Sequence, residues 1–135
     1  MTTSTISKKA FLHQLAAEYV TKGLGAKNFD AIPYHDDVEL RAPLLPGGSE
    51  VPIKGKENLR TLWWAPLPTL VGQTTVVETY VSKDDNSVAV EFYCEIIKPA
   101  CTLRVIDRFK VDEDGKIVSQ ENFFDPRPVT DAGKV

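Results

Sequence analysis

The sequence predicts an α+β domain in which one face of an antiparallel sheet packs on N-terminal helices. Two stretches before Ala65 carry apolar residues at helical spacing, whereas the segments from Gly72 onward alternate apolar and polar residues as strands do. Turn signals at residues 84–86 and 114–115 separate the alternating segments. Because the helices come first and the strands follow, the two kinds of element form separate layers.

The first helix is expected from Ser7 to about Leu24. Ser7 is a suitable N-cap, and the glycines Gly23 and Gly25 end the helical spacing. The expected apolar face of this helix consists of Phe11, Leu12, Leu15, Ala16, Tyr19 and Val20.

A helical turn, a strand, a loop and a second helix are expected next. The helical turn covers residues 29–34 and the strand covers residues 38–42. Residues 44–54 are rich in proline and glycine and are expected to form the loop. The second helix covers residues 56–65 and is stopped by Pro66.

The rest of the chain is expected to contain only strands and a tail. The strands lie at residues 73–82, 87–97, 100–111 and 116–125. The tail, residues 126–135, contains two prolines and few apolar residues, so we expect it to be loosely ordered.

Composition indicates a single domain over residues 1–135. The chain of 135 residues is 42% hydrophobic, which is enough apolar material for one core. The net charge is −3, with acidic and basic residues mixed, so we expect no nucleic acid as a partner. No apolar run reaches membrane-spanning length, and the polar start, residues 1–5, lacks a signal core. We therefore expect a cytoplasmic protein that does not bind membranes.

Asp107 breaks the alternation of its strand. It occupies the same face as the apolar residues of that strand, whereas Arg104 and Arg108 point the other way. A tight turn at Lys98-Pro99 sets a hairpin register that places Val90 opposite Asp107. A buried carboxylate must be neutral, paired or functional, because an isolated buried charge is very costly.

The last strand brings further polar groups to Asp107. Val118, Gln120, Asn122 and Phe124 have the same inward parity, so Gln120 or Asn122 is expected beside Asp107. Polar groups among apolar walls are typical of a small-molecule pocket. They are equally typical of a buried hydrogen-bond cluster that only fixes packing, and the pattern leaves both open.

No metal or cofactor is expected. The two cysteines, Cys94 and Cys101, are diagonal neighbours on one hairpin and are expected to be buried thiols, not a disulfide or a metal site. His35 lies next to Asp36 and Asp37 in a turn, without the spacing that metal ligands need.

The order of elements and several motifs resemble the nuclear transport factor 2-like (NTF2-like) superfamily, in particular its ketosteroid isomerase and SnoaL-like cyclase branches. Residues 101–109 and 112–119 look most like the penultimate hairpin of bacterial ketosteroid isomerases. The resemblance covers nearly the whole chain. It implies a cone-shaped, curved antiparallel sheet of the NTF2-like, or cystatin-like, kind.

The resemblance also implies roles for individual residues. Asp107 falls on the acidic residue of the isomerases' oxyanion hole, which is kept protonated so that it donates a hydrogen bond to the enolate oxygen. Tyr19 matches the oxyanion-hole tyrosine, and Tyr34 matches a supporting tyrosine. Trp63 stands where a third tyrosine would be; it can donate a hydrogen bond but cannot accept one.

The chain departs from the isomerases at their general base. The position of that aspartate is Ala42, which cannot carry a proton between carbon atoms. The epoxide-hydrolase branch fits no better, because its acidic residues would fall on Cys94 and Asn122. Glu78 and Asp125 remain as alternative bases.

Two functional hypotheses follow. In the first, the chain is an isomerase or cyclase-like enzyme acting on a cyclic ketone through a Tyr19/Asp107 oxyanion hole. In the second, it is a non-catalytic binding module for a small apolar ketone or phenol. Ala42 favours the second, but we narrowly favour the first because a buried donor pair costs stability if nothing uses it. The expected substrate-binding residues are Tyr34, Ala42, Trp63, Phe92, Val105, Gln120, Asn122 and Phe124.

An association surface is expected on the opposite face of the sheet. Tyr93, Ile106 and Phe123 point outward among charged residues. Domains of the NTF2-like superfamily commonly dimerise through this face, so the resemblance implies a homodimer.

Overall fold

The structure is a computed structural model that describes residues 7–45 and 47–131. The polar start and the last four residues of the predicted tail lie outside the described residues. The helices are α1 (Lys8–Glu18), α2 (Lys56–Leu59), α3 (Leu67–Leu70) and α4 (Arg127–Thr130). Wider π-helical turns continue α1 over Tyr19–Leu24 and α2 over Arg60–Trp64, and short 3-10 turns lie at Phe29–Ala31 and Gly48–Glu50. None of the described helices is long and apolar enough to span a membrane.

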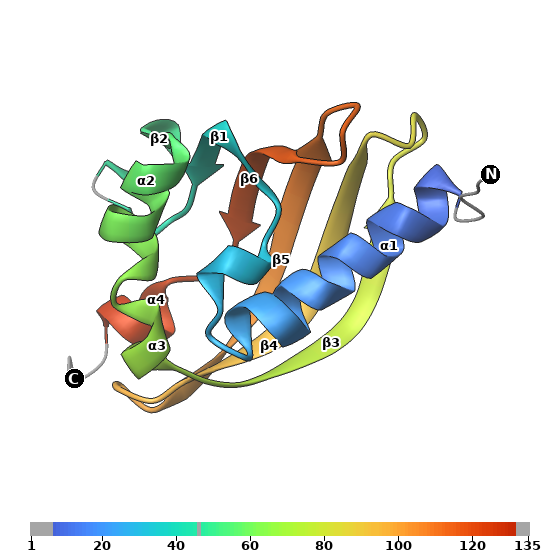
Figure 1. Cartoon of the computed structure of the whole chain (residues 1–135). Coiled ribbons are helices and arrows are strands. Elements are labelled where there is room, and N and C mark those ends of the chain that lie inside the picture. Colours follow the sequence, from blue (N-terminus) through green and yellow to red (C-terminus); the bar gives the residue numbers. More distant parts are fainter. Residues whose placement is uncertain (1–6, 46, 132–135) are drawn as a thin grey trace.

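Six strands form one curved, open sheet (Figure 1). They are β1 (Tyr34–Arg41), β2 (Ile53–Lys54), β3 (Val71–Val81), β4 (Ser87–Ile96), β5 (Cys101–Val111) and β6 (Ile117–Phe123). The order across the sheet is β2-β1-β6-β5-β4-β3. All neighbouring strands are antiparallel except β1 and β6, which are parallel. The predicted α+β class and antiparallel meander are confirmed, with β1 added to the meander through one parallel pair.

Helix α1 lies across the sheet and covers β3 and β4 (Figure 1). At the opposite end of the molecule α2 packs on β1, and α3 contacts the start of β3. The predicted N-cap is confirmed, because the Ser7 hydroxyl accepts a hydrogen bond from the Ala10 amide at 3.1 Å. Phe11 was assigned wrongly to the apolar face. It lies near the start of the helix, with its ring against Gly115 of the β5–β6 turn, and is 38% exposed.

The hairpin register is the one predicted from the turn at Lys98-Pro99. Val90 lies opposite Asp107, and on the other side of β5 Asp107 lies opposite Asn122. Val118 was predicted to point inward, which is wrong. A β-bulge near the start of β6 shifts the register, so that Ile117 fills the core and Val118 is only half-buried.

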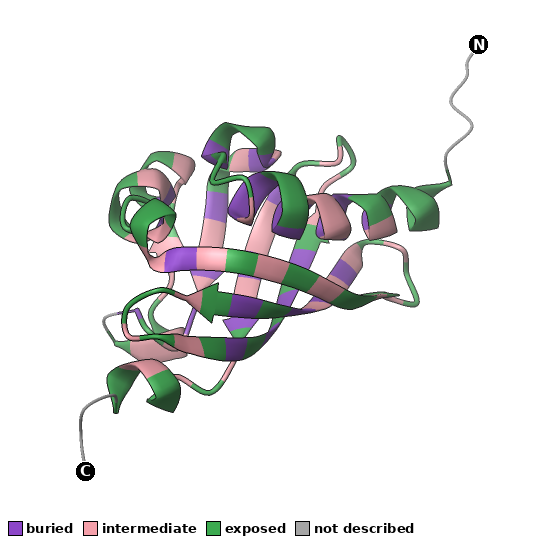
Figure 2. Ribbon diagram, turned by 90° about the horizontal axis from the view of Figure 1, so that it is seen from below, coloured by how far each residue is buried: buried purple, intermediate pink, exposed green. Residues whose placement is uncertain are grey.

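The core lies between the concave face of the sheet and the helices. Buried and exposed bands alternate along the strands in Figure 2, as expected for a sheet with one covered face. The buried residues are apolar with three exceptions: Asp107, Gln120 and Asn122 are only 1%, 1% and 4% exposed. The buried carboxyl and amide side chains of the described core therefore all come from two adjacent strands, β5 and β6.

Candidate functional site

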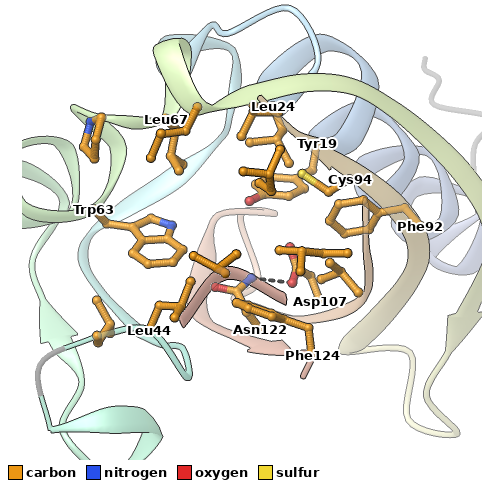
Figure 3. A pocket seen from close by; sticks show the side chains of 18 of the residues that line it. Tyr19, Leu24, Leu44, Trp63, Leu67, Phe92, Cys94, Asp107, Asn122 and Phe124 are labelled. Carbon is orange, nitrogen blue, oxygen red and sulfur yellow. Dashed lines mark hydrogen bonds between the residues drawn. The ribbon is translucent and has the colours of Figure 1, made fainter. Parts of the chain in front are cut away.

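A pocket of about 310 Å³ opens between the sheet and the helices at the α2–α3 end of the molecule (Figure 3). This volume lies at the lower end of the range for small-molecule sites. Most of its wall is apolar. The lining residues are Tyr19, Leu24, Leu44, Leu45, Leu62, Trp63, Pro66, Leu67, Leu70, Val71, Phe92, Cys94, Ile96, Lys98, Leu103, Val105, Asp107, Asn122, Phe124 and Val129.

Tyr19 is held by a chain of buried hydrogen bonds behind the pocket. The Tyr34 hydroxyl donates to Oε1 of Gln120 at 2.5 Å, and Nε2 of Gln120 donates to the Tyr19 hydroxyl oxygen at 3.1 Å. The Tyr19 ring also packs on Phe109, with 4.8 Å between ring centroids. Because the Tyr19 oxygen accepts from Gln120, its own proton is free to point toward Asp107 and the pocket.

The π-helical turn that begins at Tyr19 places this side chain at the end of α1. The turn is held close to the edge strand β3, because the Thr74 hydroxyl donates a hydrogen bond to the Val20 carbonyl at 3.0 Å. A Cβ on Gly25 would lie 2.7 Å from the Thr74 hydroxyl oxygen, so this contact requires glycine. The sheet edge and the wider turn together fix where Tyr19 enters the pocket.

Asp107 forms the polar end of the pocket with Asn122. The amide Nδ2 of Asn122 donates to the carboxyl oxygen Oδ1 of Asp107 across the β5–β6 ladder (Figure 3). Burial raises the pKa of Asp107 from 3.8 to about 7, although hydrogen bonding from Asn122 and Tyr19 acts in the opposite direction. Burial and the Asp107 charge raise the pKa of Tyr19 well above its ordinary value. Near neutral pH the site therefore holds a protonated phenol beside a carboxyl group that is easily protonated.

Two buried polar atoms at this site lack a hydrogen-bond partner within the described part of the chain. They are Nε1 of Trp63 and Oδ1 of Asn122. In Figure 3 the indole nitrogen of Trp63 points into the pocket, and the amide of Asn122 turns its oxygen away from Asp107, to the side of Trp63. The first atom can only donate and the second can only accept.

The expected site residues divide into two layers. Seven of them line the pocket: Tyr19, Trp63, Phe92, Val105, Asp107, Asn122 and Phe124. Tyr34 and Gln120 lie behind Tyr19 in the hydrogen-bond chain, and Ala42 is fully buried outside the lining. The two alternative bases lie elsewhere. Glu78 accepts from the Thr79 amide at an exposed position, and Asp125 pairs with Arg127, which lowers the Asp125 pKa to about 2.

Several wall residues were missing from the sequence-based prediction. Leu67 and Leu70 come from α3, and Val129 comes from α4, both of them segments that prolines seemed to exclude from helices. Cys94 had the predicted inward parity but no assigned role, and burial raises its pKa to about 12. Lys98, in the β4–β5 turn, is exposed and lines the pocket as well. Proline is tolerated in the first turn of a helix, and this was the signal that could have identified α3 and α4.

Cys94 and Cys101 are free thiols. Cys94 is buried as predicted, whereas Cys101, at the start of β5, is only partly buried. Within residues 7–45 and 47–131, no three histidine, cysteine, aspartate or glutamate side chains are grouped so that they could hold a metal ion.

The chain is similar in fold to several solved structures. A steroid delta-isomerase from Pseudomonas aeruginosa shares 22% identity, with a TM-score of 0.68 over 94% of this chain and 86% of that one. The epoxide hydrolase/cyclase-like enzyme SalBIII, which acts in pyran ring formation in the polyether salinomycin, shares 20% identity, with a TM-score of 0.68 over 83% of this chain and 88% of that one. RV0760c from Mycobacterium tuberculosis, in complex with estradiol-17beta-hemisuccinate, shares 16% identity, with a TM-score of 0.65 over 89% of this chain and 95% of that one.

No curated protein matches the sequence. Residues 16–120 match the family described as the SnoaL-like domain. This match includes Tyr19, Asp107 and strands β1 to β5, and it ends within β6, just before Asn122. It confirms the predicted resemblance to the NTF2-like superfamily. The chain belongs to the SnoaL-like domain family.

Proposed function

We propose that this protein binds a small, largely apolar cyclic ketone or phenol whose oxygen lies against Asp107 and Tyr19. The observation that carries the proposal is the position of Asp107. It is 1% exposed at the end of an apolar pocket, and among the described residues no lysine or arginine pairs with it. A neutral carboxylic acid in such a place can donate a hydrogen bond to a ligand oxygen.

The shape and lining of the pocket support a ring-shaped apolar ligand. Its walls are built from leucine, valine and aromatic side chains, and its volume of about 310 Å³ suits a molecule of two or three fused rings. The similar fold of RV0760c was solved with a steroid derivative, and another similar fold is a computationally designed 17-OHP binder. Both support a pocket of this kind as a site for fused-ring ligands.

An isomerase-type enzyme is the second candidate function. The Tyr19/Asp107 donor pair favours it, because such a pair stabilises a developing enolate oxygen. Proton transfer also needs a base, and Asp107 is the only carboxylate among the described lining residues. We therefore rank ligand binding ahead of isomerisation.

The first experiment is a titration with 2-naphthol, a fused-ring phenol, followed by its ultraviolet absorbance. We expect saturable binding by the wild type and roughly 10- to 100-fold weaker binding by Asp107→Leu, as for a hydrogen bond to an ionisable group. Asp114→Leu, in the exposed β5–β6 turn, is the matched control and should bind like the wild type. Binding that is equal in wild type and Asp107→Leu would overturn the proposed oxyanion site.

A second experiment separates binding from catalysis. The protein is incubated with 1-tetralone in deuterated water, and incorporation of deuterium beside the carbonyl is followed by NMR. Binding without exchange above the buffer rate is expected for a binding module. Exchange that requires Asp107 would instead establish enolisation, the chemical step that an isomerase performs.

We also propose that the protein forms a homodimer through the outer sheet face. Tyr93, Ile106 and Phe123 are 43%, 41% and 43% exposed there, and Arg108 lies over the Phe123 ring at 5.4 Å. Apolar side chains inside a charged rim are typical of an association surface. Sedimentation velocity should show a dimer for the wild type and a monomer for Ile106→Ser; a monomeric wild type would contradict the proposal.

A further inference from the structure

Two unpartnered atoms in the pocket define a second polar position for the ligand. Nε1 of Trp63 and Oδ1 of Asn122 are buried and have no hydrogen-bond partner within the described residues. A buried donor or acceptor without a partner costs about 1–3 kcal/mol, so native proteins rarely keep such groups without a use. Both residues line the same pocket, which is otherwise almost entirely apolar.

The two atoms are complementary. The indole N–H can only donate a hydrogen bond, and the amide oxygen can only accept one. A hydroxyl group does both: its oxygen accepts from Trp63 while its proton is donated to Asn122. Figure 3 shows the indole nitrogen pointing into the pocket and the amide oxygen on the side of Asn122 that faces away from Asp107. A ligand hydroxyl group that came within hydrogen-bond distance of both atoms would satisfy both.

Asn122 connects this position to the oxygen site. Its Nδ2 donates to Asp107, which fixes the amide so that Oδ1 faces the other way. The two ends of one amide group therefore belong to two neighbouring ligand positions. A ring system that carries both polar groups holds them at a fixed separation and so suits two neighbouring positions.

We propose that the ligand is a cyclic hydroxy ketone, with its carbonyl oxygen at Asp107 and Tyr19 and its hydroxyl group between Trp63 and Asn122. This inference rests on the proposed function and narrows its ligand class. Trp63 thereby becomes a specificity-determining residue: it distinguishes hydroxylated ketones from plain ones. The pocket walls bind both kinds of ligand through apolar contact.

The test compares ligands that differ only in the hydroxyl group. Affinities for 1-tetralone, 2-hydroxy-1-tetralone and 4-hydroxy-1-tetralone are measured by isothermal titration calorimetry. We expect at least one hydroxylated ligand to bind the wild type about five- to tenfold more tightly than 1-tetralone. In Trp63→Phe this ratio should fall to about one. Using the ratio cancels any loss of apolar contact, since that loss affects all three ligands.

Trp64→Phe is the matched control. Trp64 is the neighbouring indole, but it is buried against Phe29, with 5.4 Å between ring centroids, and is absent from the pocket lining. Its removal should leave the wild-type ratio in place. A second measurement uses the wild type and so does not need Trp63→Phe. The NMR spectrum contains two indole N–H signals, and the hydroxylated ligand should shift the Trp63 signal further than 1-tetralone does.

The outcomes distinguish the two proposals. If 1-tetralone binds in an Asp107-dependent manner but neither hydroxyl group improves binding, the hydroxy-ketone inference is wrong and the proposed function stands. An equal gain in wild type and Trp63→Phe also overturns the inference. If none of the three ketones binds, both proposals fail.

Discussion

Two neighbouring rungs of the β5–β6 ladder place charged side chains in opposite environments. Asp107 and Asn122 face the pocket, where the carboxyl is 1% exposed and its pKa is raised to about 7. On the next rung Arg108 and Glu121 face outward and form an ion pair at 3.1 Å, with the arginine side chain 54% exposed. One residue of sequence separates a buried carboxyl group with a raised pKa from an ion pair whose arginine is exposed to solvent. The side of the sheet, more than the residue type, determines the chemistry of a carboxylate in this fold.

An unpaired polar side chain lowers the stability of the fold on the inner face of the sheet but not on the outer face. A polar group that faces inward, out of reach of water, destabilises the fold unless a protein or ligand group pairs with it. Gln120 meets this requirement by accepting from Tyr34 and donating to Tyr19. On the outer side solvent can replace any lost partner. Mutations on adjacent residues of β6 can therefore test the comparison directly.

The largest expected effect is that of Gln120→Met. Methionine keeps the approximate size of the side chain but removes both hydrogen bonds, leaving the Tyr34 hydroxyl without its acceptor and the Tyr19 oxygen without its donor. We expect a loss of about 2–4 kcal/mol in the free energy of unfolding, measured in urea. A loss below about 1 kcal/mol would show that the chain of hydrogen bonds contributes little to the fold.

The pH dependence of stability tests the inner carboxyl. Because the pKa of Asp107 rises from 3.8 to about 7 on folding, the folded state holds a proton between these values that the unfolded state has released. Its contribution to stability is therefore complete below about pH 4 and is lost as the pH rises through 7. We expect the wild type to lose about 2 kcal/mol between pH 5 and 7 relative to Asp107→Asn.

Asp125→Asn is the control for this pH profile. Hydrogen bonding to Arg127 lowers the pKa of Asp125 to about 2. Asp125 therefore contributes to stability above about pH 4, and this contribution is lost as the pH falls below that value. The slope between pH 5 and 7 should therefore survive this substitution. Each variant changes one carboxyl group only, so the difference between two profiles reports on that group. Parallel profiles for wild type and Asp107→Asn would contradict the raised pKa.

The inward-facing position of Asp107 was predictable from the sequence, because side chains along a strand alternate strictly between its two faces. The turn at Lys98-Pro99 fixed the pairing of Val90 with Asp107. Inward parity then left Gln120 or Asn122 as the neighbour of Asp107 in the last strand, and the structure shows that it is Asn122. Where parity failed, a bulge was the cause: it turned Val118 away from the core and put Ile117 in its place. A bulge inserts one residue without any composition signal that a single sequence reveals.

The pocket wall was less predictable than its polar end. Trp63 could be assigned to the site only through the resemblance. Its unpartnered N–H depends on how the π-helical turn after α2 places the indole in the pocket wall. Leu67 and Val129 reach the pocket from short helices that tertiary contacts stabilise, since four residues are too few for a helix to be stable alone. Contacts of this kind depend on the packing of distant segments and leave no local pattern.

The smallest expected effect on stability is that of changing the outward-facing pair of Arg108 and Glu121. Glu121→Gln removes the charge of the ion pair with Arg108 but keeps the shape of the side chain, and a solvated pair of this kind contributes roughly 0.2–1 kcal/mol. In the Ile106→Ser background, which should keep the outer face free, we expect a loss of unfolding free energy below about 0.5 kcal/mol. In the wild-type background a dimer would cover this pair and remove water from it, so the same substitution should cost more. Equal losses in the two backgrounds would argue against a dimer on this face, and a loss matching that of Gln120→Met would overturn the contrast between the two sides of the sheet.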